Sequence, residues 1–234
     1  MHRIVQYRSI GDGDSKRSFN MSNGEAVYGF FIPTVTLMGI GSHKQLGAQM
    51  KTLGVTKPFL VADKGITACG LTQQICDMIK EDVGVDAVVY DDTIPNPTDN
   101  NVAEGLKLYK ESGCDMIITL GGGSAHDCGK GVGIVATNGG TIHDYEGVDQ
   151  STKAMPPFIA INTTAGTGSE MTRFCIITDT SRKVKMAIVD WRVTPTIAIN
   201  DPLLMLGMPS FLTAATGMDA LTHSVEAYVS TIAT

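Results

Sequence analysis

Residues 115–124 read Asp-Met-Ile-Ile-Thr-Leu-Gly-Gly-Gly-Ser, an apolar run that leads directly into a glycine turn. A continuous apolar run of this length is typical of a strand buried on both faces of a parallel sheet. The glycines let a backbone approach a pyrophosphate closely, and a helix that begins here offers free N–H groups and the positive end of its dipole. The junction therefore predicts a phosphate-binding turn, the alternative being a strand–helix turn that only needs positive φ.

The same alternation of strand and helix extends in both directions along the chain. We expect strands at 35–40, 57–62, 86–90, 158–162 and 196–199. We expect helices at 42–53 with Ser42 as N-cap, at 65–81, at 98–112 with Thr98 as N-cap, and from 209 and 217 onward, the last still running at 234. A hairpin is expected from 175–178 and 185–189 around a turn at 179–181. The pattern predicts an α/β fold whose parallel sheet is covered on both faces.

Composition excludes several classes of protein. The chain has 234 residues and 26 glycines, where ordinary usage gives about 16. A net charge of −6 argues against a nucleic-acid partner, and no apolar run approaches the ~18 residues of a membrane span. The first twenty residues lack an apolar h-region, so we expect no secretory signal, a disordered extension at 1–22 and a cytoplasmic protein. Reduced thiols are expected at Cys69, Cys76, Cys114, Cys128 and Cys175.

Two further polar features follow apolar strands. Asp63 ends the strand at 57–62, where an acid can bind both hydroxyls of an adenosine ribose and repel a 2′-phosphate; a helix cap is the competing role. Residues 163–170 pack threonines, glycines and a serine directly after the strand at 158–162. Ligands of open α/β sheets bind past the carboxyl ends of the strands, so this loop is either a ligand contact or a solvated surface loop.

Asp219 and His223 stand four residues apart in an expected helix. That spacing places both side chains on one helix face, where an oxygen and a nitrogen can bind one divalent metal. A hydrogen-bonded pair, or a cap beside a surface histidine, is the plainer alternative. His43 and His143 are expected to be exposed, and His126 lies beside the glycine turn.

Five motifs in this order resemble the iron-containing (group III) alcohol dehydrogenases. They are Asp63, 95–98 (Pro-Asn-Pro-Thr), 121–124 followed by Asp127 and Lys130, 163–170, and 217–223. The resemblance covers about residues 24–234 and looks closest to the branch that holds the 1,3-propanediol and NAD-dependent methanol dehydrogenases. It implies an N-terminal parallel-sheet cofactor domain of the dehydroquinate synthase-like type over 23–207. The first part of an all-helical metal-binding domain would follow at 208–234, with its remainder absent from a C-terminally truncated chain.

The resemblance also implies site residues. Cofactor contacts fall on Asp63, Asn96, Gly122, Gly123, Ser124, Asp127, Lys130, Thr163, Thr164, Thr167, Phe174 and Lys185. Metal ligands fall on Asp219 and His223, for Fe²⁺ or alternatively Zn²⁺, and two further histidine ligands of the family lie beyond residue 234.

The activity implied is NAD-dependent, metal-assisted hydride transfer between small primary alcohols or diols and aldehydes. Two alternatives stay open: a truncated, inactive fragment that at best binds nucleotide, and a dehydroquinate synthase-like lyase that also pairs NAD with a metal. The expected partner is a small alcohol or aldehyde, without nucleic acid or membrane, in a homo-oligomer when the protein is full length.

Overall fold

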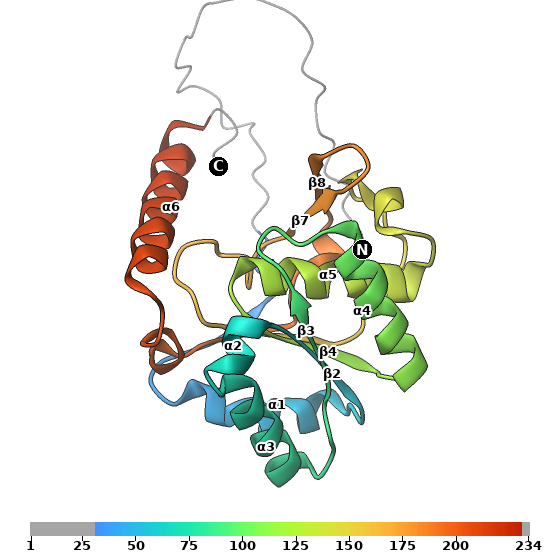
Figure 1. The fold of residues 1–234 in the computed structure, drawn as a ribbon, viewed down its shortest axis with the longest axis vertical. Coiled ribbons are helices and arrows are strands. Elements are labelled where there is room, and N and C mark those ends of the chain that lie inside the picture. Colours follow the sequence, from blue (N-terminus) through green and yellow to red (C-terminus); the bar gives the residue numbers. More distant parts are fainter. Residues whose placement is uncertain (1–30, 231–234) are drawn as a thin grey trace, which may run out of the picture.

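Six parallel strands form the central sheet of the molecule, in the order β1-β9-β6-β4-β2-β3 (Figure 1). The computed structural model describes residues 31–230. The strands are β1 (Val35–Met38), β2 (Pro58–Asp63), β3 (Val88–Thr93), β4 (Met116–Gly121), β6 (Phe158–Asn162) and β9 (Ile197–Asn200). All six were expected from apolar runs, although β3 lies two to three residues later than 86–90 and β1 ends before residue 40.

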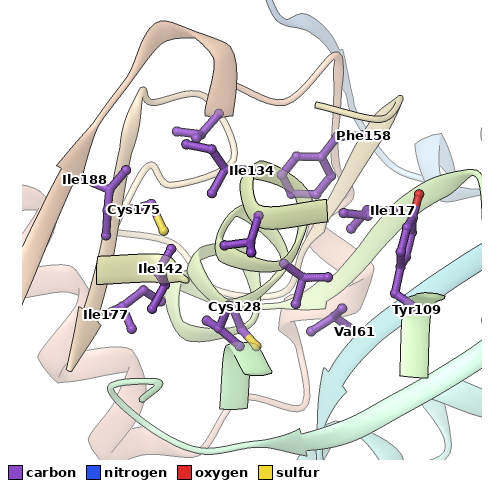
Figure 2. Packing of buried hydrophobic residues seen from close by; sticks show 14 of the residues in the cluster. Val61, Tyr109, Ile117, Cys128, Ile134, Ile142, Phe158, Cys175, Ile177 and Ile188 are labelled. Atoms are coloured by element: carbon purple, nitrogen blue, oxygen red, sulfur yellow. The ribbon is translucent and has the colours of Figure 1, made fainter. Parts of the chain in front are cut away.

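Helices cover both faces of this sheet. They are α1 (Leu46–Leu53) and α3 (Leu71–Val83) on one face, and α4 (Asp99–Ser112) and α5 (Gly123–Asn138) on the other (Figure 1). Neighbouring residues of β4 point to opposite faces, as the pleat requires. Ile118 packs in one buried cluster with Met50 of α1, whereas Ile117 packs in the other with Tyr109 of α4 and Ile134 of α5 (Figure 2). The expected α/β class is confirmed.

A smaller sheet packs against α5. It contains β5 (Gly147–Val148), β7 (Phe174–Asp179) and β8 (Val184–Val189), in the order β5-β8-β7. The hairpin expected from 175–178 and 185–189 is confirmed as the antiparallel pair β7–β8, which buries Cys175, Ile177 and Ile188 with the residues of α5 (Figure 2). The two-residue strand β5 was not predicted, because it is too short to show a pattern.

Several local predictions need correction. The helix expected at 65–81 is two helices, α2 (Lys64–Ala68) and α3, separated at Gly70 with a φ of 85°. Ser42 opens a short 3₁₀ helix, η1 (Ser42–Gln45), without acting as a side-chain cap. His43 is buried and bonds to Asp201 rather than being exposed. The N-cap at Thr98 is confirmed, with a capping box to Asn101.

The C-terminal helix also differs from expectation. The two helices expected from 209 and 217 are one continuous helix, α6 (Ser210–Val229), which stands at the edge of the molecule (Figure 1). Gly217 lies inside it, because one helical glycine costs only about 1 kcal/mol relative to alanine. Residues 231–234, where the helix was expected to continue, and the expected extension at 1–22 lie outside the described residues. The domain boundary at 207 stays a prediction.

Three further 3₁₀ helices connect these elements: η2 (Ile142–Tyr145), η3 (Trp191–Val193) and η4 (Pro202–Met205). The five cysteines are free; Cys114, Cys128 and Cys175 are buried, Cys76 is partly buried and Cys69 is exposed. None of the helices within residues 31–230 combines the length and apolar character needed to cross a bilayer.

The turn of the β7–β8 hairpin depends on the carboxylate of Asp179. This carboxylate accepts hydrogen bonds from the hydroxyl and N–H groups of Ser181 and from Arg182. These bonds, the Ser181 hydroxyl first, hold the pKa of Asp179 well below its ordinary 3.8. Since the folded pKa is depressed, the stabilisation is present above the unfolded pKa and is lost as the pH falls through the folded pKa.

We therefore expect Asp179→Asn to lower the melting temperature at pH 7, and this deficit to shrink as the pH falls below 3.8. Thermal melts of both proteins between pH 7 and pH 2 measure it. Asp86→Asn is the control, because its exposed ion pair with Lys80 contributes little. A deficit that is constant with pH would contradict the role of the Asp179 carboxylate.

Candidate cofactor and metal site

The order of strands reverses direction between β2 and β4. From β2 the chain continues to β3 on one side, and from β4 it continues to β6 on the other. Such a reversal leaves a crevice at the carboxyl ends of the strands, where ligands of open α/β sheets bind. Asp63 ends β2 and Gly121 ends β4, and Asp63 Oδ2 lies 3.8 Å from the position that a Cβ on Gly121 would take. The predicted acid and the glycine turn therefore meet at one point.

The glycine turn lies directly beneath the threonine loop. A Cβ on Gly122 would lie 2.7 Å from Thr164 Cγ2, and one on Gly123 would lie 3.0 Å from Thr167 Cγ2. Thr163 N donates to Gly121 O at 2.9 Å, which ties the loop to the turn. Gly122 is the N-cap of α5, so the N–H groups of its first turn have no partner within the helix and are free for an anion.

Two cavities open on either side of this turn. The first, the Asp63 cavity, has a volume of about 560 Å³ and includes Asp63, Gly122, Thr163 and Thr164. The second, the Asp219 cavity, has a volume of about 540 Å³ and includes Asn96, Gly123, Ser124, Asp127, Thr167, Phe174, Lys185, Asp219 and His223. Every predicted site residue except Lys130 lines one of the two.

The helix-cap role of Asp63 is confirmed, and its ribose-binding role stays a prediction. Its Oδ1 accepts a hydrogen bond from Ile66 N at 2.9 Å and thereby caps α2. Its second oxygen, Oδ2, faces the end of β4 near Gly121. One carboxylate therefore fixes the start of a helix and also presents an oxygen to the Asp63 cavity.

A polar chain closes the other side of the Asp219 cavity. Lys185 Nζ donates to Asn96 Oδ1 at 2.7 Å, and Asn96 N donates to Ser124 Oγ at 3.3 Å. Asn96 stands between two prolines with a φ of 57°, a left-handed conformation that asparagine tolerates better than most residues. These contacts join three segments that are distant in sequence: the β3–α4 turn, the start of α5 and β8.

Lys130 is placed differently from the prediction. Its side chain is fully buried behind the Asp219 cavity, and its ammonium donates to oxygens of Ser169, Thr172 and Phe174. Burial lowers the pKa of Lys130, and burial raises the pKa of the neighbouring Asp127. These acceptors among the described residues take up the N–H groups of the Lys130 ammonium. A direct hydrogen bond from Lys130 to a cofactor therefore does not fit this geometry.

Asp219 and His223 face the Asp219 cavity from α6. His223 Nε2 lies 3.7 Å from Asp219 Oδ2. The side chain of His223 is 64% exposed and that of Asp219 is 45% exposed. Helix α6 approaches the threonine loop at Gly166, where any Cβ would overlap the carbonyl oxygen of Thr216. The nitrogen and oxygen donors suit a divalent metal, but catalytic sites usually bring three protein ligands. Within residues 31–230 no third His, Cys, Asp or Glu completes a ligand group at this pair.

A separate group, Asp99, His143 and Asp179, has ligand atoms within 4.8 Å of one another. His143 Nε2 lies 3.2 Å from Asp99 and 3.5 Å from Asp179, but Arg182 already pairs with Asp179. This group is an ion-pair network that ties the hairpin to α4 and η2.

Apolar residues of the Asp63 cavity were missed by sequence reasoning. Leu203, Leu204, Met208 and Leu212 provide a wall after β9 and at the start of α6. Thr172, Ile176 and Thr178 were likewise missed in the Asp219 cavity. An available signal was that 200–205 follows the end of a parallel strand, and therefore lies at the ligand-binding edge of the sheet.

Comparison with known proteins gives consistent results. Residues 33–202 match the sequence profile described as "Iron-containing alcohol dehydrogenase". The chain is 50% identical over 206 residues to the 1,3-propanediol dehydrogenase of Citrobacter freundii, covering 87% of this chain and 53% of that protein. It is 46% identical over 205 residues to the NAD-dependent methanol dehydrogenase of Bacillus methanolicus, covering 88% and 54%.

The fold agrees with a solved relative. The structure superposes on that of a 1,3-propanediol oxidoreductase with a TM-score of 0.86 and 46% identity, covering 89% of this chain and 55% of the other. The chain thus spans about half the length of the relatives it matches. The profile match over residues 33–202, together with these identities and the shared fold, shows that the chain belongs to the iron-containing alcohol dehydrogenase family.

Proposed function

We propose that this chain binds NAD across its two cavities and serves as the cofactor-holding part of an alcohol dehydrogenase. One observation carries the proposal: the start of α5, with its glycine turn, lies between the Asp63 cavity and the Asp219 cavity where the strand order reverses. NAD consists of two nucleosides joined by a pyrophosphate, which matches two cavities with an anion site between them. The name of the Bacillus methanolicus relative, an NAD-dependent enzyme, supports the choice of cofactor.

Each part of NAD has a matching set of residues. The adenosine ribose would bind at Asp63, with the adenine against the apolar wall that includes Leu203 and Leu212. The pyrophosphate would accept hydrogen bonds from the first turn of α5 at Gly123 and Ser124. The nicotinamide end would then lie in the Asp219 cavity, where it would contact Asn96, Asp127, Thr167, Phe174 and Lys185, all of which line that cavity.

The reaction we propose is hydride transfer between NAD and a small primary alcohol or diol. Relatives named for 1,3-propanediol and methanol support this substrate class. Asp219 and His223 would hold the metal, Fe²⁺ or Zn²⁺, together with ligands from outside the described residues. A divalent metal there, when bound, supplies a Lewis acid that lowers the pKa of an alcohol oxygen. The task of this chain's own residues is to orient the nicotinamide and to position the alcohol next to it.

The carboxylate of Asp63 should decide the choice between NAD and NADP. Asp63→Asn keeps a side chain that caps helices equally well, but removes the charge that faces the ribose. We expect roughly tenfold weaker NAD binding and stronger NADP binding, because a charge-assisted hydrogen bond is lost and repulsion of the 2′-phosphate ends. Calorimetric titration with both nucleotides measures the change. Asp77→Asn, an exposed carboxylate on α3, is the matched control; equal effects of the two substitutions would argue against the role of Asp63.

Asp219 and His223 are tested as the proposed metal ligands. The test uses the protein purified from its native cells. We expect Asp219→Ala or His223→Ala to abolish alcohol-dependent NADH formation and to reduce the amount of bound metal. The affinity for NAD should stay within about twofold of the wild type. Glu226→Gln, an exposed acid on the same helix, should retain both activity and metal. Unchanged turnover in either alanine variant would remove the metal role. A wild type that consumes substrate without accumulating NADH would favour the lyase alternative.

A further inference from the structure

Lys130 carries a fully buried ammonium whose hydrogen bonds converge on one short segment. Its Nζ donates to Ser169 O at 2.7 Å, to Thr172 O at 3.0 Å and to Phe174 O at 2.7 Å. A fourth acceptor is Ser169 Oγ at 3.0 Å. Lys130 lies in the second turn of α5, while its acceptors lie about 40 residues further along the chain. The contact therefore links α5 to residues 169–174.

Asp127, one helical turn before Lys130, ties the same segment from a second side. Its Oδ1 accepts from Ser169 Oγ at 2.8 Å and lies 4.0 Å from Lys130 Nζ. Its Oδ2 accepts from Ile176 N at 3.2 Å, at the start of β7. The carboxylate and the ammonium therefore share Ser169 Oγ, and together they clamp both ends of the segment onto α5.

Energetics require that such a lysine be held by many partners. Removing an ammonium from water costs several kcal/mol, and only hydrogen bonds and a counter-charge offset this cost. Residues 169–174 consist of turns and irregular backbone up to the first residue of β7, so their carbonyl groups have few regular partners. Three of these carbonyl groups accept a hydrogen bond from Lys130 Nζ. This ammonium therefore provides the donors that neighbouring backbone N–H groups provide in a helix or sheet.

The clamped segment lines the Asp219 cavity and leaves the Asp63 cavity untouched. Ser169, Thr172 and Phe174 line the Asp219 cavity together with Gly123, and none of the three lines the Asp63 cavity. Since α5 carries the glycine turn at its own start, Lys130 fixes the spacing between that turn and the surface of the cavity that residues 169–174 form.

We propose that Lys130 is a positioning residue that sets the affinity for the nicotinamide half of the cofactor without touching the cofactor. This inference rests on the proposed NAD binding and extends it, because it separates the two halves of the dinucleotide. Loss of the ammonium releases residues 169–174 and widens the Asp219 cavity. The Asp63 cavity and the glycine turn, which bind the adenosine and pyrophosphate, keep their geometry.

The test compares NAD with ADP, which lacks the nicotinamide half, on the 234-residue chain. We expect Lys130→Met, similar in size but uncharged, to weaken NAD binding by about tenfold or more and to change ADP binding less than about twofold. Val132→Ala, buried on the same helix without a bond to residues 169–174, is the control for general loss of stability. It should leave both affinities, and their ratio, unchanged.

Hydrogen exchange without nucleotide gives a second readout. In Lys130→Met the amides of 169–176 should exchange faster than in the wild type, while those of α5 do not. Ser169→Ala, which removes the hydroxyl shared by Lys130 and Asp127, should shift exchange and NAD affinity in the same direction by less. It serves as the test if Lys130→Met fails to fold.

Two results overturn the inference. The first is that both variants keep the hydrogen-exchange rates and the NAD affinity of the wild type. The second is that NAD binding and ADP binding are weakened equally, which indicates a general structural role. If the wild-type chain binds neither NAD nor ADP, the proposed function itself fails, together with the claim about affinity. If the wild type binds both nucleotides and the variants do as well, only the role of Lys130 is wrong.

Discussion

The site depends on one steric constraint, the absence of side chains where β4 passes into α5. A Cβ on Gly122 would clash with Thr164 at 2.7 Å and one on Gly123 would press on Thr167 at 3.0 Å, so the threonine loop packs directly on the turn. This close approach brings the end of β6 to the end of β4 and places hydroxyl groups above the free N–H groups of α5. Any larger residue in the turn would separate the two surfaces, and the cavities on either side would lose their common wall.

A second constraint follows from the first. Because the turn is shared by the two cavities, the residues that line each cavity must be held at a fixed distance from the turn. On one side Asp63 does this through local structure, since it caps α2 and ends β2 at the same time. On the other side no regular element reaches the cavity from residues 169–172. The buried ammonium of Lys130 holds these residues in place instead. This role accounts for a charged side chain in the interior, where most buried side chains are apolar.

Sequence reasoning predicted the features that depend on neighbouring residues. Buried strands show continuous apolar runs, and Thr98 shows a local cap signal, so the sheet and the start of α4 could be located. The glycine turn and the acid after β2 were found because both follow strand ends. Features that depend on distant partners were missed: His43 is buried by Asp201, 158 residues away, and Lys130 by a segment about 40 residues away. Sequence spacing carries no signal for such contacts, and the resemblance alone assigned Lys130 to the cofactor.

The two halves of the site differ in how firmly the described chain holds them. The glycine turn and the threonine loop are held together by the hydrogen bond from Thr163 N to Gly121 O and by direct packing of Thr164 and Thr167 on the turn. Asp219 and His223 instead project from a helix that meets the rest of the site at Gly166, and about half or more of each side chain is exposed. On binding the proposed metal, two such exposed side chains would lose rotamer freedom and would supply only two of its ligands. The proposed nucleotide site is therefore formed by side chains and backbone of residues 31–230, whereas metal binding at Asp219 and His223 would need ligands beyond this pair.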